Sequence, residues 1–79
     1  MEFYEIGQQI KETRKEKKLS QDELAEQVGI IRQTLSKLEK GQMGKISLQV
    51  LIKILDGLNQ ELYIEEKKSF YYFDPKGVE

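Results

Sequence analysis

The stretch that most constrains this chain runs from residue 20 to residue 41, SQDELAEQVGIIRQTLSKLEKG, because it predicts two short helices joined by a tight turn. Ser20 and Glu23 form a capping box, in which each side chain accepts from the other residue's backbone N–H. Gly29 comes directly after the apolar residues of this helix and supplies the left-handed conformation that ends it. The second helix is then expected over about residues 32–40.

This second helix has an apolar side and a polar side. Its inward side carries Thr34, Leu35 and Leu38. Its outward side carries polar or basic side chains, Arg32, Gln33, Ser36 and Lys37. Such side chains can hydrogen-bond base edges or phosphates, whereas a helix side that only faces water more often carries Glu/Lys pairs. Capping boxes and apolar stripes are common in small helical domains, so the prediction of a DNA-binding helix-turn-helix rests on their combination at this spacing.

Three segments follow one another along the chain, IGQQIKETRKEKKLSQDELAEQVGI, RQTLSKLEKG and ISLQVLIKILDGL. Through these segments, residues 6–58 resemble the Cro/CI-type (Xre-type) helix-turn-helix family. The resemblance implies an all-α fold over residues 1–60, a lambda-repressor-like bundle of about four to five helices. It also implies a sequence-specific transcriptional repressor of prokaryotic or phage origin and no enzymatic activity.

We expect two groups of residues in this motif to contact double-stranded DNA. The N-terminus of a helix favours anions, so the start of the first helix is expected to hold a phosphate, while arginine suits guanine and glutamine suits adenine in the major groove. The predicted base-reading residues are Ile31, Arg32, Gln33, Ser36 and Lys37. The predicted phosphate contacts are Ser20, Gln21, Thr34, Lys40, Gly41 and Lys45.

Ile31 departs from the family pattern, which usually places a small polar residue at this position to cap the second helix. Isoleucine cannot accept a capping hydrogen bond, and its presence is expected to cost roughly 1 kcal/mol relative to serine. Two interpretations of Ile31 stay open at this point. It either contacts a thymine methyl group or packs against the neighbours of Ile30.

The resemblance also implies an ion pair. In the family, an arginine late in the first helix and a glutamate at the end of the recognition helix form a partly buried pair, and Arg14 and Glu39 fill these positions. The first helix is expected from about Tyr4 to Lys17 or Lys18. The pair would fix the angle between two helices, because loss of one partner leaves an uncompensated charge in a poorly solvated place.

Composition and charge exclude several classes of function. A length of 79 residues predicts one small domain. The chain contains no cysteine and no histidine, so we expect no disulfide, zinc finger or histidine-based catalysis, and we expect no cofactor. The net charge of −1 argues weakly against DNA binding, but residues 30–45 carry four basic side chains and one acidic side chain. No signal peptide and no apolar run of about 20 residues is recognisable, which predicts a cytoplasmic protein without membrane contact.

After a glycine-containing loop, Ser47 is expected to cap a further helix with a broad apolar face that extends to Gly57. The face is wider than a single stripe. We expect Leu48, Leu51 and Leu55 to belong to the core. Ile52 and Leu58 could instead face a partner.

Residues 61–66, ELYIEE, alternate apolar and polar side chains and predict a short strand with Leu62 and Ile64 on one face. A single strand in a helical chain needs a partner for its backbone groups. One alternative is the same strand of a second copy across a two-fold axis. The other is a local hairpin with the aromatic residues 70–73.

The segment LDGLNQELYIEE resembles the end of the HipB-like antitoxins, whose C-terminal strand pairs across a dimer. This implies a homodimer that binds a palindromic operator, represses its own operon and holds a toxin, a HipA-like kinase. The predicted dimer interface is Ile52, Leu58, Leu62, Tyr63 and Ile64. The alternatives are a stand-alone repressor without a toxin and a protein-interaction domain that has lost DNA binding, and the basic character of residues 30–45 argues against the latter.

Residues 61–79 are accordingly assigned to dimerisation or partner binding. The tail from residue 69 contains the aromatic run FYYF. Aromatic residues at the end of a chain either cover the domain's own core or form a patch that contacts a protein partner.

Overall fold

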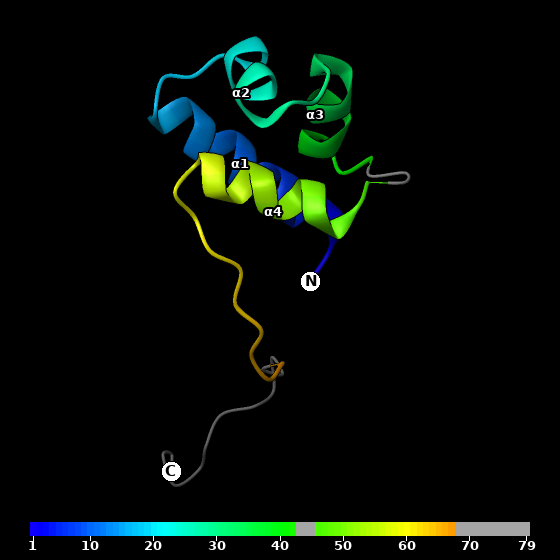
Figure 1. Cartoon of the computed structure of the whole chain (residues 1–79). Helices are drawn as coiled ribbons and strands as arrows, with labels where there is room; N and C mark the ends of the chain where they lie inside the picture. The colour runs from blue at the N-terminus through cyan, green and yellow to red at the C-terminus, as the bar shows by residue number, and fades with distance from the viewer. Residues whose placement is uncertain (43–45, 68–79) are drawn as a thin grey trace, which may run out of the picture.

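The computed structural model describes residues 1–42 and 46–67, and this part of the chain contains four α-helices (Figure 1). Their bounds are Phe3–Glu16 for α1, Gln21–Val28 for α2, Arg32–Glu39 for α3 and Leu48–Gly57 for α4. Helix α3 packs against α1 and α2, and α2 also packs against α4. In Figure 1, α2 and α3 lie above α1 and α4, and the chain after α4 leads away from the helices. The all-helical prediction is therefore confirmed.

The start and end of α2 follow the predicted local interactions. The Ser20 hydroxyl accepts from the Glu23 backbone N–H at 3.0 Å, and the Ser20 N–H donates to the Glu23 carboxylate at 2.8 Å. Gly29 has a φ of +88°, and its N–H donates to the carbonyl of Ala25 at 2.8 Å. The left-handed glycine lets the chain turn at once, so only three residues separate the end of α2 at Val28 from the start of α3 at Arg32.

The other helix ends differ from prediction by small amounts. Helix α1 ends at Glu16 rather than at residue 17 or 18, and α3 ends at Glu39 rather than at residue 40. At its start, α1 has a capping box between Glu2 and Glu5, which the sequence analysis missed because glutamate is an uncommon N-cap residue. Ser47 caps α4 as expected, since its hydroxyl accepts from the Val50 N–H at 3.1 Å.

The apolar core lies where the four helices meet. Each helix contributes, and the buried apolar residues are Ile10, Leu24, Ala25, Leu35, Leu38, Leu51, Ile54, Leu55 and Leu58. A fully buried leucine or isoleucine contributes about 1.5–3 kcal/mol to stability relative to an exposed one. Leu35 and Leu38 belong to this core, so the inward side of α3 is held by apolar packing and its outward side is left at the surface.

Burial corrects two predictions about α4. Leu51 and Leu55 are buried, as expected, but Leu48 is 63% exposed because it is the first residue of the helix and lies outside the core. Leu58 is completely buried, so its assignment to a dimer interface is wrong. Leu58 is the C-cap of α4, and its N–H still bonds to the carbonyl of Ile54. This last turn holds the Leu58 side chain against the chain's own core.

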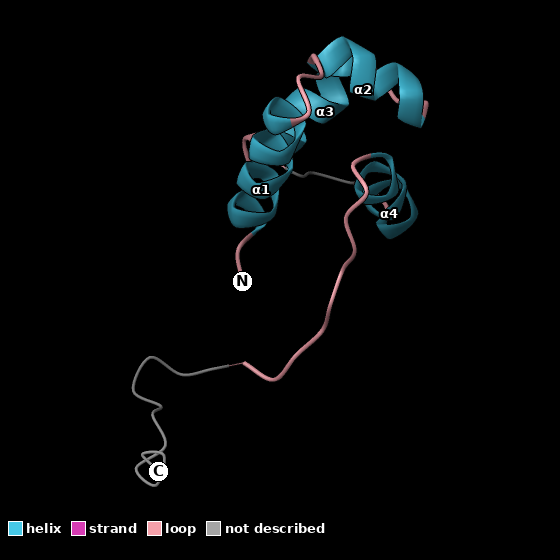
Figure 2. Cartoon of the chain, turned by 90° about the vertical axis from the view of Figure 1, so that its left-hand side faces the viewer, coloured by secondary structure: helices cyan, strands magenta, loops and turns pink. Residues whose placement is uncertain are grey.

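The strand predicted at residues 61–66 is absent from the described part of this single chain. Residues 61–67 form no ladder of hydrogen bonds, and Figure 2 draws this segment as a loop. A strand needs a second segment to pair its backbone groups, and residues 1–42 and 46–67 offer it none. Leu62, Tyr63 and Ile64 are all exposed. The alternative hairpin partner, residues 70–73, lies outside the described residues.

Two glycines allow α1 to lie directly on the end of α3. A Cβ atom on Gly7 would overlap the carbonyl oxygen of Leu38 and would lie 2.9 Å from that of Glu39. Gly41 has a φ of +80°, and a Cβ atom there would lie 2.6 Å from the Cβ of Tyr4. Only glycine fits these approaches without moving the backbone. The position of α3 therefore depends on close contact with α1.

Candidate nucleic-acid interface

The outward residues of α3 form one basic surface. Arg32, Gln33 and Lys37 are exposed and Ser36 is half-buried. Together with two residues that follow them in the chain, they line a hollow of about 270 Å³, whose lining residues are Arg32, Gln33, Ser36, Lys37, Lys40 and Gln42. The lining includes three cationic side chains and no carboxylate. A surface of this kind attracts anions, and its amide and hydroxyl groups can donate and accept hydrogen bonds.

Gln42 is a member of this surface that the sequence analysis missed. Its side chain is exposed, and its backbone N–H donates to the carbonyl of Lys37 at 2.8 Å. This bond closes the end of α3 over the left-handed Gly41, so that residue 42 returns to the side of the helix that carries Lys37. In the sequence, Gly41 follows a predicted helix and the polar Gln42 follows Gly41. This pattern is too common to identify a binding site.

A buried ion pair holds α3 against α1. The Arg14 Nε lies 2.7 Å from the Glu39 Oε2, and the Arg14 Nη2 donates to the Glu39 Oε1 at 3.1 Å. The Arg14 Nη1 donates to the backbone carbonyl of Leu19 at 2.8 Å. Both side chains are almost fully buried. The pair is bidentate and additionally hydrogen-bonded, which is the arrangement that a buried charge pair needs to be tolerated.

Gln21 is joined to the same pair. Its amide nitrogen donates to the Glu39 Oε1 at 3.0 Å, a contact that the sequence analysis did not foresee. A carboxylate only accepts, so the amide nitrogen of Gln21 must face Glu39. The amide also has a second N–H and a carbonyl oxygen that can meet a ligand. Gln21, the first residue of α2, is therefore held in place by the last residue of α3.

The remaining predicted residues of the motif lie around this network. Ile31 is the N-cap of α3, makes no capping hydrogen bond through its side chain and is 65% exposed, whereas Ile30 packs against the core. The interpretation that Ile31 packs beside Ile30 is therefore wrong. Thr34 is half-buried on α3. Ser20 and Lys40 are exposed, Gly41 is half-buried, and Lys45 lies outside the described residues.

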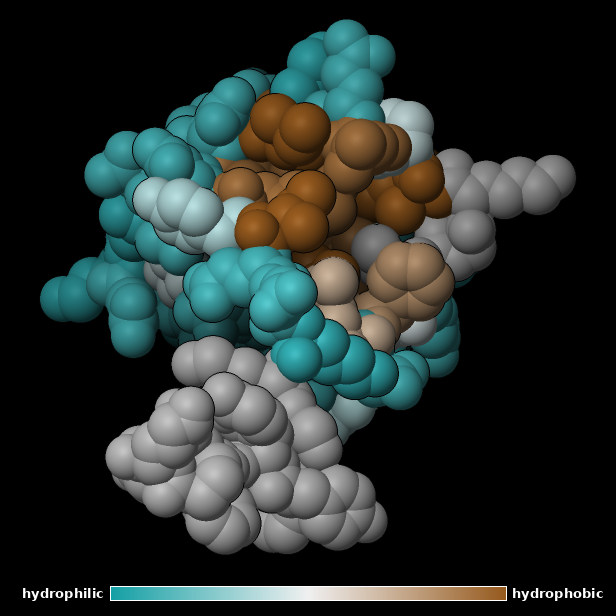
Figure 3. Space-filling view, turned by 90° about the horizontal axis from the view of Figure 1, so that it is seen from below, coloured by the Kyte–Doolittle hydropathy of each residue, from teal (hydrophilic) through white to brown (hydrophobic). Residues whose placement is uncertain are grey.

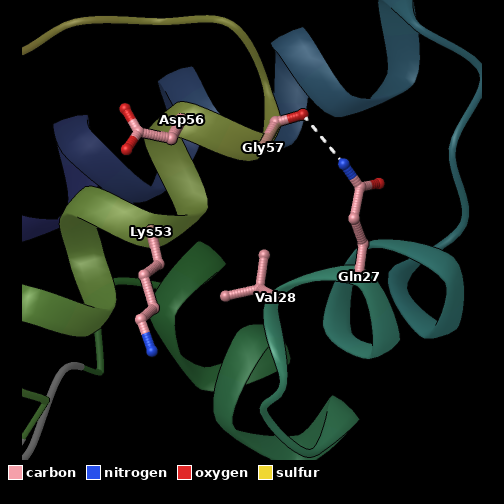
Figure 4. A pocket seen from close by; sticks show the side chains of 5 residues that line it. All are labelled: Gln27, Val28, Lys53, Asp56 and Gly57. Atoms are coloured by element: carbon pink, nitrogen blue, oxygen red, sulfur yellow. Dashed lines mark hydrogen bonds between the residues drawn. The ribbon is translucent and has the colours of Figure 1, made fainter.

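A second hollow lies between α2 and α4 and contains none of the predicted DNA-contacting residues. Figure 4 shows the residues that line it, Gln27, Val28, Lys53, Asp56 and Gly57. The Gln27 amide donates to the Gly57 carbonyl at 3.4 Å, which connects the two helices across the hollow. Within residues 1–42 and 46–67, no group of three or more acidic side chains could hold a metal ion, and no helix is long and apolar enough to cross a membrane.

Comparison with known proteins identifies the family. Residues 10–63, which span the second half of α1 and all of α2, α3 and α4, match the model HTH_3, described as helix-turn-helix. The chain belongs to the helix-turn-helix family. The helix-turn-helix pair of this family member is α2 and α3, joined at Gly29.

Two curated relatives and one solved structure are similar to it. The HTH-type transcriptional regulator SinR of Bacillus subtilis (strain 168) is 38% identical over 69 residues, which are 85% of this chain and 62% of SinR. An uncharacterized HTH-type transcriptional regulator of Methanothermobacter thermautotrophicus is 47% identical over 57 residues, 72% of this chain and 80% of that protein. A crystal structure of SinR, the master regulator for biofilm formation, in complex with DNA has a TM-score of 0.65 and 41% identity, with 71% of this chain and 89% of that chain covered. The chain thus spans about three-fifths of the length of B. subtilis SinR.

Proposed function

We propose that this protein is a transcription regulator that reads a DNA site with the outward side of α3. The observation that carries the proposal is the hollow of Arg32, Gln33, Lys37 and their neighbours on a helix that the Arg14–Glu39 pair holds in place. The same fold has been solved in complex with DNA for SinR, which supports this function for a chain that is 41% identical to it.

In the proposed complex, α2 holds the DNA backbone and α3 enters the major groove. The free N–H groups at the start of α2 and the amide of Gln21 bind a phosphate, which fixes the register. Arg32 donates to O6 and N7 of a guanine, and Gln33 pairs with N6 and N7 of an adenine. Ser36 and Lys37 contact the next bases. Further phosphates are held by Ser20, Thr34, Lys40, Gly41 and Lys45.

The exposed side chain of Ile31 gives the motif one apolar contact. It precedes Arg32 at the start of α3 and belongs to none of the core residues. We assign it to the methyl group of a thymine, which is the apolar feature of the major groove.

A homodimer is part of the proposal, because one such domain contacts too few bases for tight, selective binding. Exposed apolar side chains are available for it on the face that carries α4, where Figure 3 shows apolar surface gathered. The proposed interface is Ile52, Leu62, Tyr63 and Ile64, with residues 61–66 pairing as a strand only when two copies meet. The operator is then a palindrome with half-sites about 34 Å apart.

We assign the dimer a repressor function, since a protein that covers operator DNA blocks access to it. A second candidate is the HipB-like antitoxin, which also holds a HipA-like toxin kinase. The exposure of Leu62, Tyr63 and Ile64 favours some protein contact at this end of the chain. Co-purification with a kinase encoded beside the gene would support the antitoxin, and the absence of such a neighbouring gene would count against it.

The function is tested by binding to DNA from upstream of the protein's own gene. We expect a footprint there and a higher affinity for this DNA than for a random duplex. Arg32→Ala and Gln33→Ala should each weaken specific binding by about 1–3 kcal/mol and relax one position of each half-site. Lys53→Ala, on α4 and outside the basic hollow, is the matched control. Equal losses on specific and random DNA would refute base reading by these residues.

A further inference from the structure

A second ion pair connects the two helices of the motif at the protein surface. The Nε of Arg32 lies 3.7 Å from the Oδ1 of Asp22. Asp22 is in the first turn of α2, and Arg32 is the first residue of α3. The side chain of Arg32 is 62% exposed and that of Asp22 is 78% exposed. Both groups are therefore open to a ligand that docks across the two helices.

The carboxylate of Asp22 is unfavourable for DNA binding in itself. It follows Gln21, the residue proposed to hold a phosphate, so its negative charge repels every DNA backbone regardless of sequence. The position of Arg32 is also unfavourable in itself, because the positive end of the α3 dipole repels a cation at the start of that helix. The Asp22 carboxylate offsets this repulsion by facing the guanidinium.

Contact through Nε determines how the rest of the guanidinium is presented. Arginine carries five N–H donors in a planar fork, and Nε supplies one of them. When Nε faces a carboxylate, the far edge of the guanidinium, with one N–H from each terminal nitrogen, stays free, and two parallel donors are the pattern that O6 and N7 of guanine accept. A long arginine side chain has many rotamers, so a partner that restricts them lowers the entropy cost of this contact.

We propose that Asp22 is a positioning residue that aims Arg32 at a guanine. This inference rests on the proposed function of α3. Asp22 lowers the affinity for all DNA and raises the preference for guanine at one position of each half-site. The selectivity of the protein then depends on a residue that touches no base.

The test compares base preference with affinity for random DNA. Preference is measured by selecting bound duplexes from a random library, and affinity by fluorescence anisotropy on a random duplex. The variants are Asp22→Ala, Arg32→Ala and the double variant. Asp56→Asn is the charge-matched control, because it removes one negative charge from α4, outside the basic hollow that α3 lines.

Arg32→Ala should abolish the guanine preference at one position of each half-site. Asp22→Ala should lower the guanine preference at that same position by about fivefold or more. This change corresponds to the lower end of the free energy by which a bidentate contact discriminates between bases. Asp22→Ala should leave the other positions unchanged and tighten binding to random DNA about twofold or more, because one repulsive charge is gone. In the Arg32→Ala background, Asp22→Ala should change no base preference. Asp56→Asn should change neither preference nor random-DNA affinity.

Three outcomes overturn the inference, and they differ in what else they reject. If Arg32→Ala relaxes one position and Asp22→Ala leaves that preference intact, Asp22 has no positioning role while base reading by Arg32 stands. If Asp22→Ala alters the preference even without Arg32, it acts on DNA directly. If Arg32→Ala relaxes no position, base reading by Arg32 fails and the inference fails with it. Equal thermal melts of Asp22→Ala and the unchanged protein exclude misfolding as the cause of any difference.

Discussion

At the residue scale, Glu39 accepts three hydrogen bonds from two side chains that come from different helices. Arg14 supplies Nε and Nη2, and Gln21 supplies its amide nitrogen. One carboxylate thereby joins the end of α3 to α1 and to the start of α2. The proposed phosphate-binding and base-reading groups are held relative to each other through this buried group.

Replacing Arg14 by methionine should lower the free energy of unfolding by about 3 kcal/mol or more, because Glu39 then keeps a buried charge without its partner. The measurement is a thermal or urea melt of the purified protein. Lys15→Met, at the exposed neighbouring position, is the control and should have little effect. A melt of Arg14→Met that matches that of Lys15→Met would show that the pair does not stabilise the fold.

Replacing Ile31 by serine should stabilise the protein by about 1 kcal/mol, since serine can accept an N-cap hydrogen bond from α3 and isoleucine cannot. Ile31→Ala is the control, because it removes the exposed isoleucine side chain without supplying a capping oxygen. This variant should not be more stable than the unchanged protein. The same two variants report on function. Both should lose preference for thymine at one operator position, and unchanged selectivity in both would reject the proposed methyl contact.

At the scale of elements, the approach of α1 to the end of α3 depends on backbone-to-backbone contact. Gly7 is buried in α1, against the carbonyl groups of Leu38 and Glu39. Because α3 carries the proposed reading surface, any shift of this contact moves that surface. The start of α3 is tied to α2 by the turn at Gly29, so α3 is restrained at both ends.

Gly7→Ala should destabilise the protein by about 2 kcal/mol. Overlap with rigid backbone costs about 3 kcal/mol at this level of crowding, which exceeds the gain of about 1 kcal/mol from the higher helix propensity of alanine. Gly57→Ala is the control, because its Cβ would lie 3.4 Å from a methyl group of Val28, an ordinary side-chain contact. Urea melts of both variants measure the difference, and equal stability would mean that α1 moves away from α3 at no cost.

At the scale of the whole molecule, the four helices leave apolar side chains uncovered. Leu48 and Ile52 on α4 are exposed, and so are Leu62 and Ile64 in the segment that follows the helices. A small domain gains stability when such surface is buried against another copy. The backbone of residues 61–67 forms no strand with any other described segment, and in the proposed dimer it would gain hydrogen bonds in the same step.

The variant Leu62→Glu/Ile64→Glu should therefore be monomeric and lack the proposed dimer, because two charges per chain would enter an apolar interface. Sedimentation equilibrium measures the mass directly. Glu61→Gln/Glu65→Gln, at alternating positions of the same segment, is the control and should stay dimeric. An unchanged mass of the Leu62→Glu/Ile64→Glu variant would place the dimer interface elsewhere, and a monomeric parent protein would reject the dimer itself.

The sequence by itself determined the features that depend on neighbours within one helical turn. The capping box at Ser20, the N-cap at Ser47 and the helix end at Gly29 are formed by residues at most four positions apart, so the sequence alone predicts them. The outward and inward sides of α3 follow from helical periodicity in the same way. The pairing of Arg14 with Glu39, by contrast, was known from a family resemblance, since 25 positions separate the two residues.

Only the tertiary structure decided which apolar residues are buried and which polar groups meet. Leu48 and Leu58 are both leucines at the ends of α4, yet one is exposed and the other closes the core, because burial depends on how the helices dock. The contact of Gln21 with Glu39 and that of Asp22 with Arg32 also require α2 and α3 to be in place. The strand predicted at residues 61–66 does not form within the described part of the chain for the same physical reason, since a strand needs a partner and residues 1–42 and 46–67 offer none.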